Sequence, residues 1–316
     1  MTRTDARQPS AATDFGWLAG SLVPLVTPFR DGEVDLDTFA ALVQFQVDAG
    51  SHGIVVTGTS GEPSTLTLEE RGRLVEVAVT AAAGRVPVVA ATGSQSLADT
   101  LDLTARAERA GADAVLVVTP YYIKPPQDGL VAYLARVADE TPLPLLVYHI
   151  PGRAGVTMEP ASVAKLVAAS PRVVGMKHAS VDVGYVATVL EQLPSFRIFC
   201  GLEELGYPML TLGAVGVMNA VGNIAPSVVA EMCDCVANGD HARGRELHMR
   251  LLELNRAVFW ETNPIPIKYL MKRMGLLRTN EHRLPMTPAS AALERRLDAL
   301  LDRTPWLEQA VTGEVR

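Results

Sequence analysis

The sequence predicts an α/β protein, a (βα)8 TIM barrel with a C-terminal helical appendage. Three observations lead to this fold class. Short apolar runs recur eight times with turn residues around them, the segments between them carry apolar residues at helical spacing, and the strand pattern stops near residue 226. Eight strand-helix units are the number that closes a barrel of this type.

The expected strands are near-continuous apolar runs, which are typical of a parallel sheet buried on both faces. They cover residues 21–29, 53–58, 86–93, 114–122, 143–151, 173–179, 197–203 and 214–223. A doubly wound open sheet is the alternative. It would normally carry a glycine-rich nucleotide turn after its first strand, and the turn here reads TPFRDGEVD.

The expected helices end on turn glycines. The segments DLDTFAALVQFQVDAG and LTLEERGRLVEVAVTAAAG close with Gly50 and Gly84, as helices commonly do. Near the C-terminus, NPIPIK at 263–268 marks a proline-rich entry into another helix. We therefore expect three regions, which are a mobile N-terminal tail at 1–19, the barrel at 20–225, and a helical region at 226–316 packed on the barrel.

Composition excludes several classes of partner. The chain has 316 residues, 48% of them hydrophobic, and a formal net charge of −7 with no run of Lys and Arg, which argues against nucleic acid. No apolar stretch reaches the roughly 18–20 residues of a membrane helix, and the first residues lack the apolar core of a signal peptide. We expect a cytoplasmic protein without a membrane partner.

Lys177 is the most unusual residue of the pattern, because it lies in the apolar run VVGMKHAS. An ammonium group loses affinity for its proton in a poorly solvated pocket, and the neutral amine can form a Schiff base with a carbonyl. The alternative is a lysine that snorkels to solvent or sits in an ion pair.

Other polar residues follow the expected strands, at the rim where barrel enzymes gather their chemistry. They are Thr59 and Ser60 in GTSGEPS, Tyr121 and Tyr122 in TPYYIKPP, and Tyr148 and Arg153 in VYHIPGR. A tyrosine hydroxyl linked to a threonine can relay protons, and an arginine can hold a carboxylate with two hydrogen bonds. Each is also compatible with ordinary packing or turn formation.

Metal ligation is not expected. The six histidines are scattered, and no HExxH or paired cysteine motif is present. His149 and His178 fit structural roles as well as ligand roles. Glu203 and Glu204 could serve as an acid, but we interpret them as the exposed start of a helix.

The motifs GTSGEPSTLT, VTPYY, VYHIPGRAG, GMKHAS, GVMNAVGN and NPIPIK, in this order and spacing, carry a resemblance. The chain resembles the dihydrodipicolinate synthase / N-acetylneuraminate lyase family of pyruvate-dependent class I aldolases. The resemblance runs from about residue 20 to residue 305. It implies a lyase that makes or breaks a carbon–carbon bond between pyruvate and an acidic aldehyde, without a cofactor, in a homotetramer built from dimers.

The resemblance also implies roles for particular residues. Lys177 matches the Schiff-base lysine, and Tyr148 and Thr59 match the proton relay. Tyr122 matches the last member of that relay, which is usually reached across a subunit interface. Ser60 matches the site of the pyruvate carboxylate, and Arg153 matches the arginine that binds the carboxylate of the second substrate. Gly201 and Met218 are further candidates for substrate binding.

Departures from the family pattern bear on the second substrate. His178-Ala179 stands where dihydrodipicolinate synthases have Glu-Ala, and GLEE starting at Gly201 replaces Gly-Asp-Asp. They slightly favour succinic semialdehyde, as in 2,4-dihydroxyhept-2-enedioate aldolases, over aspartate semialdehyde. Leu68 and Arg71 replace the histidines of lysine-inhibited members, so lysine feedback is not expected.

Three other functions stay open at this point. A sugar-acid lyase of the same family and a non-catalytic barrel that binds a ligand both fit the fold. A metal-dependent aldolase or phosphosugar enzyme on the same barrel is disfavoured by the missing ligand set and by the weak phosphate-loop pattern of GVMNAVGNIAPS.

Overall fold

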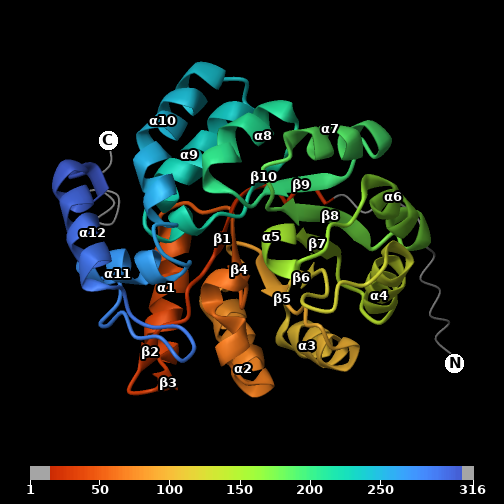
Figure 1. Cartoon of the computed structure of the whole chain (residues 1–316), viewed down its shortest axis with the longest axis horizontal. Coiled ribbons are helices and arrows are strands. Elements are labelled where there is room, and N and C mark those ends of the chain that lie inside the picture. The colour runs from red at the N-terminus through yellow and green to blue at the C-terminus, as the bar shows by residue number, and fades with distance from the viewer. Residues whose placement is uncertain (1–14, 308–316) are drawn as a thin grey trace, which may run out of the picture.

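Eight parallel strands form a closed barrel in the computed structural model, which describes residues 15–307 (Figure 1). The barrel strands are β1 (Gly20–Pro24), β4 (Gly53–Val56), β5 (Val88–Ala91), β6 (Ala114–Val118), β7 (Leu145–His149), β8 (Val173–His178), β9 (Arg197–Cys200) and β10 (Gly216–Val217). β2 (Phe29–Arg30) and β3 (Glu33–Val34) pair antiparallel outside the barrel. The fold class predicted from the apolar runs is confirmed.

Helices surround the barrel and continue beyond its last strand (Figure 1). They are α1 (Leu36–Asp48), α2 (Leu68–Ala82), α3 (Leu97–Ala110), α4 (Gln127–Asp139), α5 (Pro151–Ala154), α6 (Pro160–Ala169), α7 (Val183–Gln192), α8 (Gly206–Leu212), α9 (Pro226–Ala237), α10 (His241–Ala257), α11 (Ile265–Arg273) and α12 (Ala291–Arg303). None of these helices, within residues 15–307, is long and apolar enough to cross a bilayer.

The predicted helix ends fall at the expected glycines. α1 is followed by Gly50 and α2 by Gly84, and both glycines have positive φ, at 83° and 70°. α2 begins with a capping box in which Thr67 and Glu70 each bond the other's backbone N–H. These local signals explain why the helices start and stop where the sequence indicates.

Side chains alternate between two apolar layers along each strand, which is why the corresponding sequence segments are apolar at nearly every position. An inner cluster includes Leu22, Val55, Val89, Leu116, Leu146, Tyr148, Phe199 and Met218, and an outer cluster between barrel and helices takes the residues between them, such as Ile54, Val56, Val147 and Met176. Lys177 pairs in register with Tyr148 and Phe199, both of the inner cluster. Tyr148 and Lys177 therefore face the barrel interior.

The region boundaries stay predictions. Of the expected tail, residues 1–14 lie outside the described part of the chain, while Leu18 is buried and its carbonyl accepts a hydrogen bond of 2.8 Å from Arg197. After β10, α9 packs on β1 and on α10, and α11 packs on α12. The division at residue 226 thus falls inside the ring of helices that contacts the barrel.

Two histidines join the ends of β7 and β8 on the outer face. His149 Nδ1 and His178 Nδ1 lie 3.0 Å apart, and both rings stack on Tyr185 of α7. The N–H of Met158 donates to His149 Nε2 at 3.3 Å, so the proton of this ring is on Nδ1 and is donated to His178. The proton of His178 is then on Nε2, on the side of the ring away from His149.

Both imidazoles are held in the neutral form. Burial lowers the pKa of His149 to about 3, aided by His178, and burial also lowers the pKa of His178 to about 4. Asp182 opposes both pKa shifts without cancelling them, by a backbone hydrogen bond and its charge at His178 and by its charge alone at His149.

The histidine pair makes the fold sensitive to acid. Below pH 6.5 the unfolded chain binds protons that the folded chain excludes until about pH 3–4, so stability falls as the pH drops through this window, by about 1.4 kcal/mol per pH unit for each histidine. Urea unfolding at pH 7, 6 and 5 should show this slope. The free energy of unfolding of the double variant His149→Gln/His178→Gln should depend less on pH. An equal slope in both proteins would contradict the assignment of the acid sensitivity to this pair.

Candidate active site

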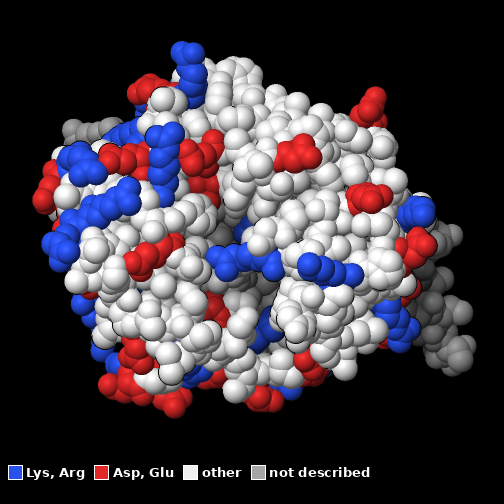
Figure 2. All heavy atoms as spheres, in the orientation of Figure 1, with Lys and Arg blue, Asp and Glu red and all other residues white. Residues whose placement is uncertain are grey.

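A cavity of about 360 Å³ opens at the C-terminal ends of the barrel strands. It is lined by Ala91 and Val118, the last residues of β5 and β6, and by Thr59, Tyr148 and Arg153 from three neighbouring segments. Figure 2 shows Lys and Arg atoms beside a hollow near the centre of the visible face. The structure thus gathers four of the sequence-predicted rim residues, Thr59, Tyr121, Tyr148 and Arg153, in one basic cavity at the rim where barrels hold their chemistry. Lys177 and Ser60 are not among its lining residues.

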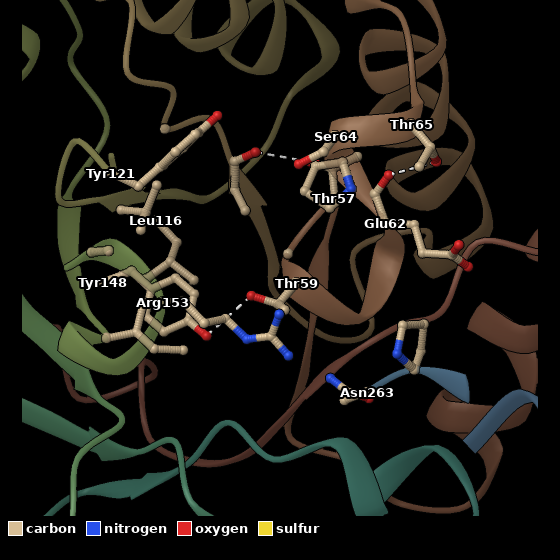
Figure 3. Close-up of a pocket in the computed structure, with 18 of the residues that line it drawn as sticks. Thr57, Thr59, Glu62, Ser64, Thr65, Leu116, Tyr121, Tyr148, Arg153 and Asn263 are labelled. Atoms are coloured by element: carbon tan, nitrogen blue, oxygen red, sulfur yellow. Dashed lines mark hydrogen bonds between the residues drawn. The ribbon is translucent and has the colours of Figure 1, made fainter. Parts of the chain in front are cut away.

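Tyr148, Thr59 and Lys177 form a contiguous group. The Tyr148 hydroxyl lies 3.1 Å from Thr59 Oγ1 (Figure 3). Lys177 Nζ lies 4.5 Å from the centre of the Tyr148 ring. Lys177 is 5% exposed, and among residues 15–307 its ammonium contacts the face of the Tyr148 ring rather than a carboxylate in ion-pair range. Neither a snorkelling lysine nor an ion-paired one describes this environment.

A glycine leaves room for the Lys177 side chain. A Cβ atom at Gly201 would lie 2.8 Å from Lys177 Cε and 2.9 Å from Ala179 Cβ, so any larger residue would displace the lysine. Met218 is fully buried in the inner cluster together with Tyr148. Neither Gly201 nor Met218 lines the cavity, and their expected contact with substrate stays a prediction.

Thr59 and Ser60 lie in a short helical turn, Thr59–Gly61, that ends on Glu62 with a left-handed φ of 54°. Ser60 Oγ accepts a hydrogen bond of 3.0 Å from Asn263 Nδ2. The hydroxyl of Thr27 donates to the Gly61 carbonyl at 2.7 Å. Side chains distant in sequence therefore fix the turn.

A buried ion pair fastens this turn to the C-terminal helices. Lys268 of α11 is fully buried, and its ammonium donates to the Thr27 carbonyl at 3.0 Å, to Glu62 Oε1 at 2.9 Å, and to the Glu281 carbonyl. His282 Nδ1 lies 3.0 Å from Glu62 Oε2. Burial lowers the pKa of Lys268, and the charge of Glu62 opposes that shift.

The sequence did not indicate these supporting residues. The NPIPIK motif predicted only a helix entry, although its first and last residues are Asn263 and Lys268. A lysine in an otherwise apolar helix stretch was the one signal that could have marked the buried pair.

Arg153 and Tyr122 occupy different surroundings. Arg153, in the short helix α5, extends its guanidinium into the cavity between Thr59 and Asn263 (Figure 3). Tyr122 is 85% exposed with φ of 73°, does not line the cavity, and donates its backbone N–H to the Ala154 carbonyl at 3.2 Å. Its expected role at a neighbouring subunit stays a prediction.

A sequence model of the Dihydrodipicolinate synthetase family matches residues 17–304. The chain belongs to the dihydrodipicolinate synthetase family. The family indicated by the sequence motifs is confirmed, and so is the prediction of a pyruvate-dependent class I aldolase.

Members of the family are similar over nearly the whole chain. The 4-hydroxy-tetrahydrodipicolinate synthase of Thermus thermophilus is 48% identical over 90% of this chain and 95% of its own length. The enzyme of that name from Maridesulfovibrio salexigens is 41% identical over 89% and 97%. The crystal structure of dihydrodipicolinate synthase from Aquifex aeolicus superposes with a TM-score of 0.89 at 38% identity, covering 91% of this chain and 98% of that one.

The departures at His178, Glu203 and Glu204 do not line the cavity, whereas the departure at Arg71 does. His178 lies on the outer face of β8, and Glu204 pairs with Arg256 at the surface, at 2.7 Å. Glu203 is 2% exposed, so the expectation of an exposed helix start is wrong for this residue. Its Oε1 accepts from the Ala220 N–H at 2.6 Å, and burial raises its pKa to about 7.

Residues 15–307 contain no cluster of three or more His, Cys, Asp or Glu side chains able to hold a metal ion.

Replacing Lys268 should lower the stability of the protein, because the turn that carries Thr59 and Ser60 loses its buried ion pair. Lys268→Met leaves the Glu62 carboxylate buried beside a neutral side chain, and losing one partner of a buried pair costs about 3–5 kcal/mol. Urea unfolding measures this cost. Lys272→Met, at an exposed position of the same helix, is the matched control, and equal stability of both variants would contradict the pair's role.

Proposed function

We propose that this member of the family condenses pyruvate with L-aspartate semialdehyde through a Schiff base on Lys177. The observation that carries the proposal is the group formed by Lys177, Tyr148 and Thr59 beside a cavity that contains Arg153. The relatives named 4-hydroxy-tetrahydrodipicolinate synthase support it. No external cofactor is required, because the imine itself serves as the electron sink.

The first half of the reaction forms the imine. The neutral Lys177 amine attacks the C2 carbonyl of pyruvate, and the carbinolamine loses its oxygen as water after protonation. Tyr148 is placed to deliver that proton, since its hydroxyl is hydrogen-bonded to Thr59. Ser60 donates a hydrogen bond from its hydroxyl group to the pyruvate carboxylate.

The second half forms the carbon–carbon bond. A proton leaves C3 of the imine to give the enamine, whose C3 attacks the aldehyde carbon of the second substrate. The aldehyde oxygen takes a proton and becomes a hydroxyl, and the iminium is restored on Lys177. Arg153 holds the carboxylate of the second substrate with a two-pronged hydrogen bond, which fixes the aldehyde near the enamine.

The choice of aspartate semialdehyde over succinic semialdehyde follows from where the departures lie. His178 lies on the outer face of β8 and Glu204 is paired with Arg256 at the surface, so neither gives a reason to expect a changed substrate. A neutral sugar aldehyde would leave the Arg153 guanidinium without its carboxylate. A homotetramer built from dimers, a cytoplasmic location and the absence of lysine feedback remain expectations drawn from the family resemblance and the composition.

Pyruvate should become covalently attached to Lys177. Reduction with borohydride in the presence of pyruvate should add a stable mass to the peptide that contains Lys177, because the trapped imine becomes a secondary amine. Lys177→Ala should not be labelled, while Lys165→Ala, at an exposed site of α6, should be labelled like the wild type. Labelling at another lysine would refute the proposal.

Tyr148→Phe should slow turnover by about 10²–10⁴, the usual contribution of a positioned proton donor. Imine formation should still occur but more slowly, since Lys177 is retained and only the proton donor for the loss of water is removed. Steady-state kinetics with pyruvate and aspartate semialdehyde, together with borohydride trapping, separates the two steps. Wild-type turnover in this variant would exclude Tyr148 from proton transfer.

A further inference from the structure

His282 reaches the turn that carries Thr59 and Ser60 from the C-terminal part of the chain. Its side chain is fully buried, and its Nδ1 lies 3.0 Å from Glu62 Oε2. A carboxylate can only accept a hydrogen bond, so Nδ1 carries the proton and donates to Glu62. The other carboxylate oxygen accepts from Lys268 at 2.9 Å. Both oxygens of Glu62 are thus held by residues that follow the last strand of the barrel.

Glu62 has a backbone conformation that requires support. It ends the turn with φ of 54° and ψ of 46°, in the left-handed region that residues other than glycine adopt only where the surrounding structure holds them there. Its N–H donates to the Thr59 carbonyl at 3.2 Å. Figure 3 shows its side chain extending away from Tyr148 and Arg153. The carboxylate therefore holds the turn from outside the group of reacting residues.

The neighbours of His282 fix its position. The Glu281 carboxylate accepts hydrogen bonds from two backbone N–H groups of the turn between β2 and β3, at 3.1 and 2.6 Å. Arg283 donates to both carboxylate oxygens of Glu70 in α2, at 2.9 and 2.7 Å. His282 thus stands between two residues that are bonded to separate elements of the fold. The imidazole is therefore presented to Glu62 from a rigid segment.

A short chain of contacts joins His282 to the proton relay. His282 holds Glu62, and the N–H of Glu62 holds the Thr59 carbonyl. Thr59 Oγ1 in turn lies 3.1 Å from the Tyr148 hydroxyl. Ser60 is fixed separately, because a side-chain amide from the segment before α11 donates to its Oγ at 3.0 Å. Loss of the His282 contact should therefore move Thr59 more than Ser60.

We propose that His282, acting through Glu62, is a positioning residue that holds Thr59 in hydrogen-bond reach of the proton relay. The inference rests on the proposed function, in which Thr59 and Tyr148 serve the proton transfers of the condensation. Proton transfer needs a direct hydrogen bond, so a misplacement of about 1 Å that originates outside the reacting group can remove a large part of the rate.

The first test replaces His282 by leucine, which fills much of the same space and offers no donor. In His282→Leu, kcat should fall by roughly 10- to 100-fold. The pyruvate concentration at half-maximal borohydride trapping should stay near the wild-type value, because Ser60 keeps its own support. In His282→Asn, whose amide nitrogen can stand where Nδ1 stood, kcat should return toward the wild type. Equal loss in both variants, or no loss in His282→Leu, would overturn the inference.

A double-mutant cycle separates positioning from a general loss of structure. Thr59→Val removes the hydroxyl with little change of shape, so adding His282→Leu to it should lower kcat by less than about twofold. A further loss as large as that of the single variant would show that His282 does not act through Thr59, and would overturn the inference. If His282→Leu does not fold, His282→Gln takes its place in the cycle, because its amide nitrogen stands where Nε2 stood and not at Nδ1.

Thr279→Val is the matched control. The Thr279 hydroxyl donates to the Phe29 carbonyl at 3.1 Å, a bond that ties the same segment to β2 rather than to Glu62. Its loss should leave kcat near that of the wild type, and a fall equal to that of His282→Leu would overturn the inference. Wild-type kcat in Thr59→Val, or a wild type that forms no pyruvate imine, would instead refute the proposed function on which the inference rests.

Discussion

The alternation of side chains along β7 and β8 is the constraint on which the site depends. Because Tyr148 and Lys177 are register partners on parallel neighbours, they are brought together on the inner face as soon as the barrel closes. The next residue of each strand, His149 and His178, must then face outward, where the two rings hydrogen-bond and stack on Tyr185. One register thus sets both the reactive pair inside and the clamp outside that holds the strand ends together.

The barrel alone does not make the cavity. Asn263 and Lys268 come from a segment that follows the last strand, yet they fix the turn that carries Thr59 and Ser60. Lys268 is fully buried, and such a charge is tolerated because its three donors all find acceptors and Glu62 neutralises it. The C-terminal helices therefore belong to the site as wall and support.

The sequence predicted the fold and the strand-end residues because both follow from local pattern. Its strands were too long where a run continues past the sheet, as in 214–223, of which only Gly216–Val217 is strand and Ala220–Asn223 turns helically. There the Asn223 side chain bonds the Pro24 carbonyl, a contact 199 residues away that no local pattern encodes. Asn263 and Lys268 were missed, and Glu203 was wrongly expected to be exposed, for the same reason, since distant partners define their surroundings.

Adjacency in sequence is a poor guide to substrate choice in a strand. His178 follows the reactive lysine directly and differs from the family pattern, yet the pleat sends it to the opposite face, against Tyr185 and away from the cavity. The departure from the family pattern at His178 affects the packing of α7 and the stability of the fold in acid, through the pair that His178 forms with His149. Selectivity has to be sought among residues that share the inner rim, such as Arg153, and those that distant segments deliver there, such as Asn263.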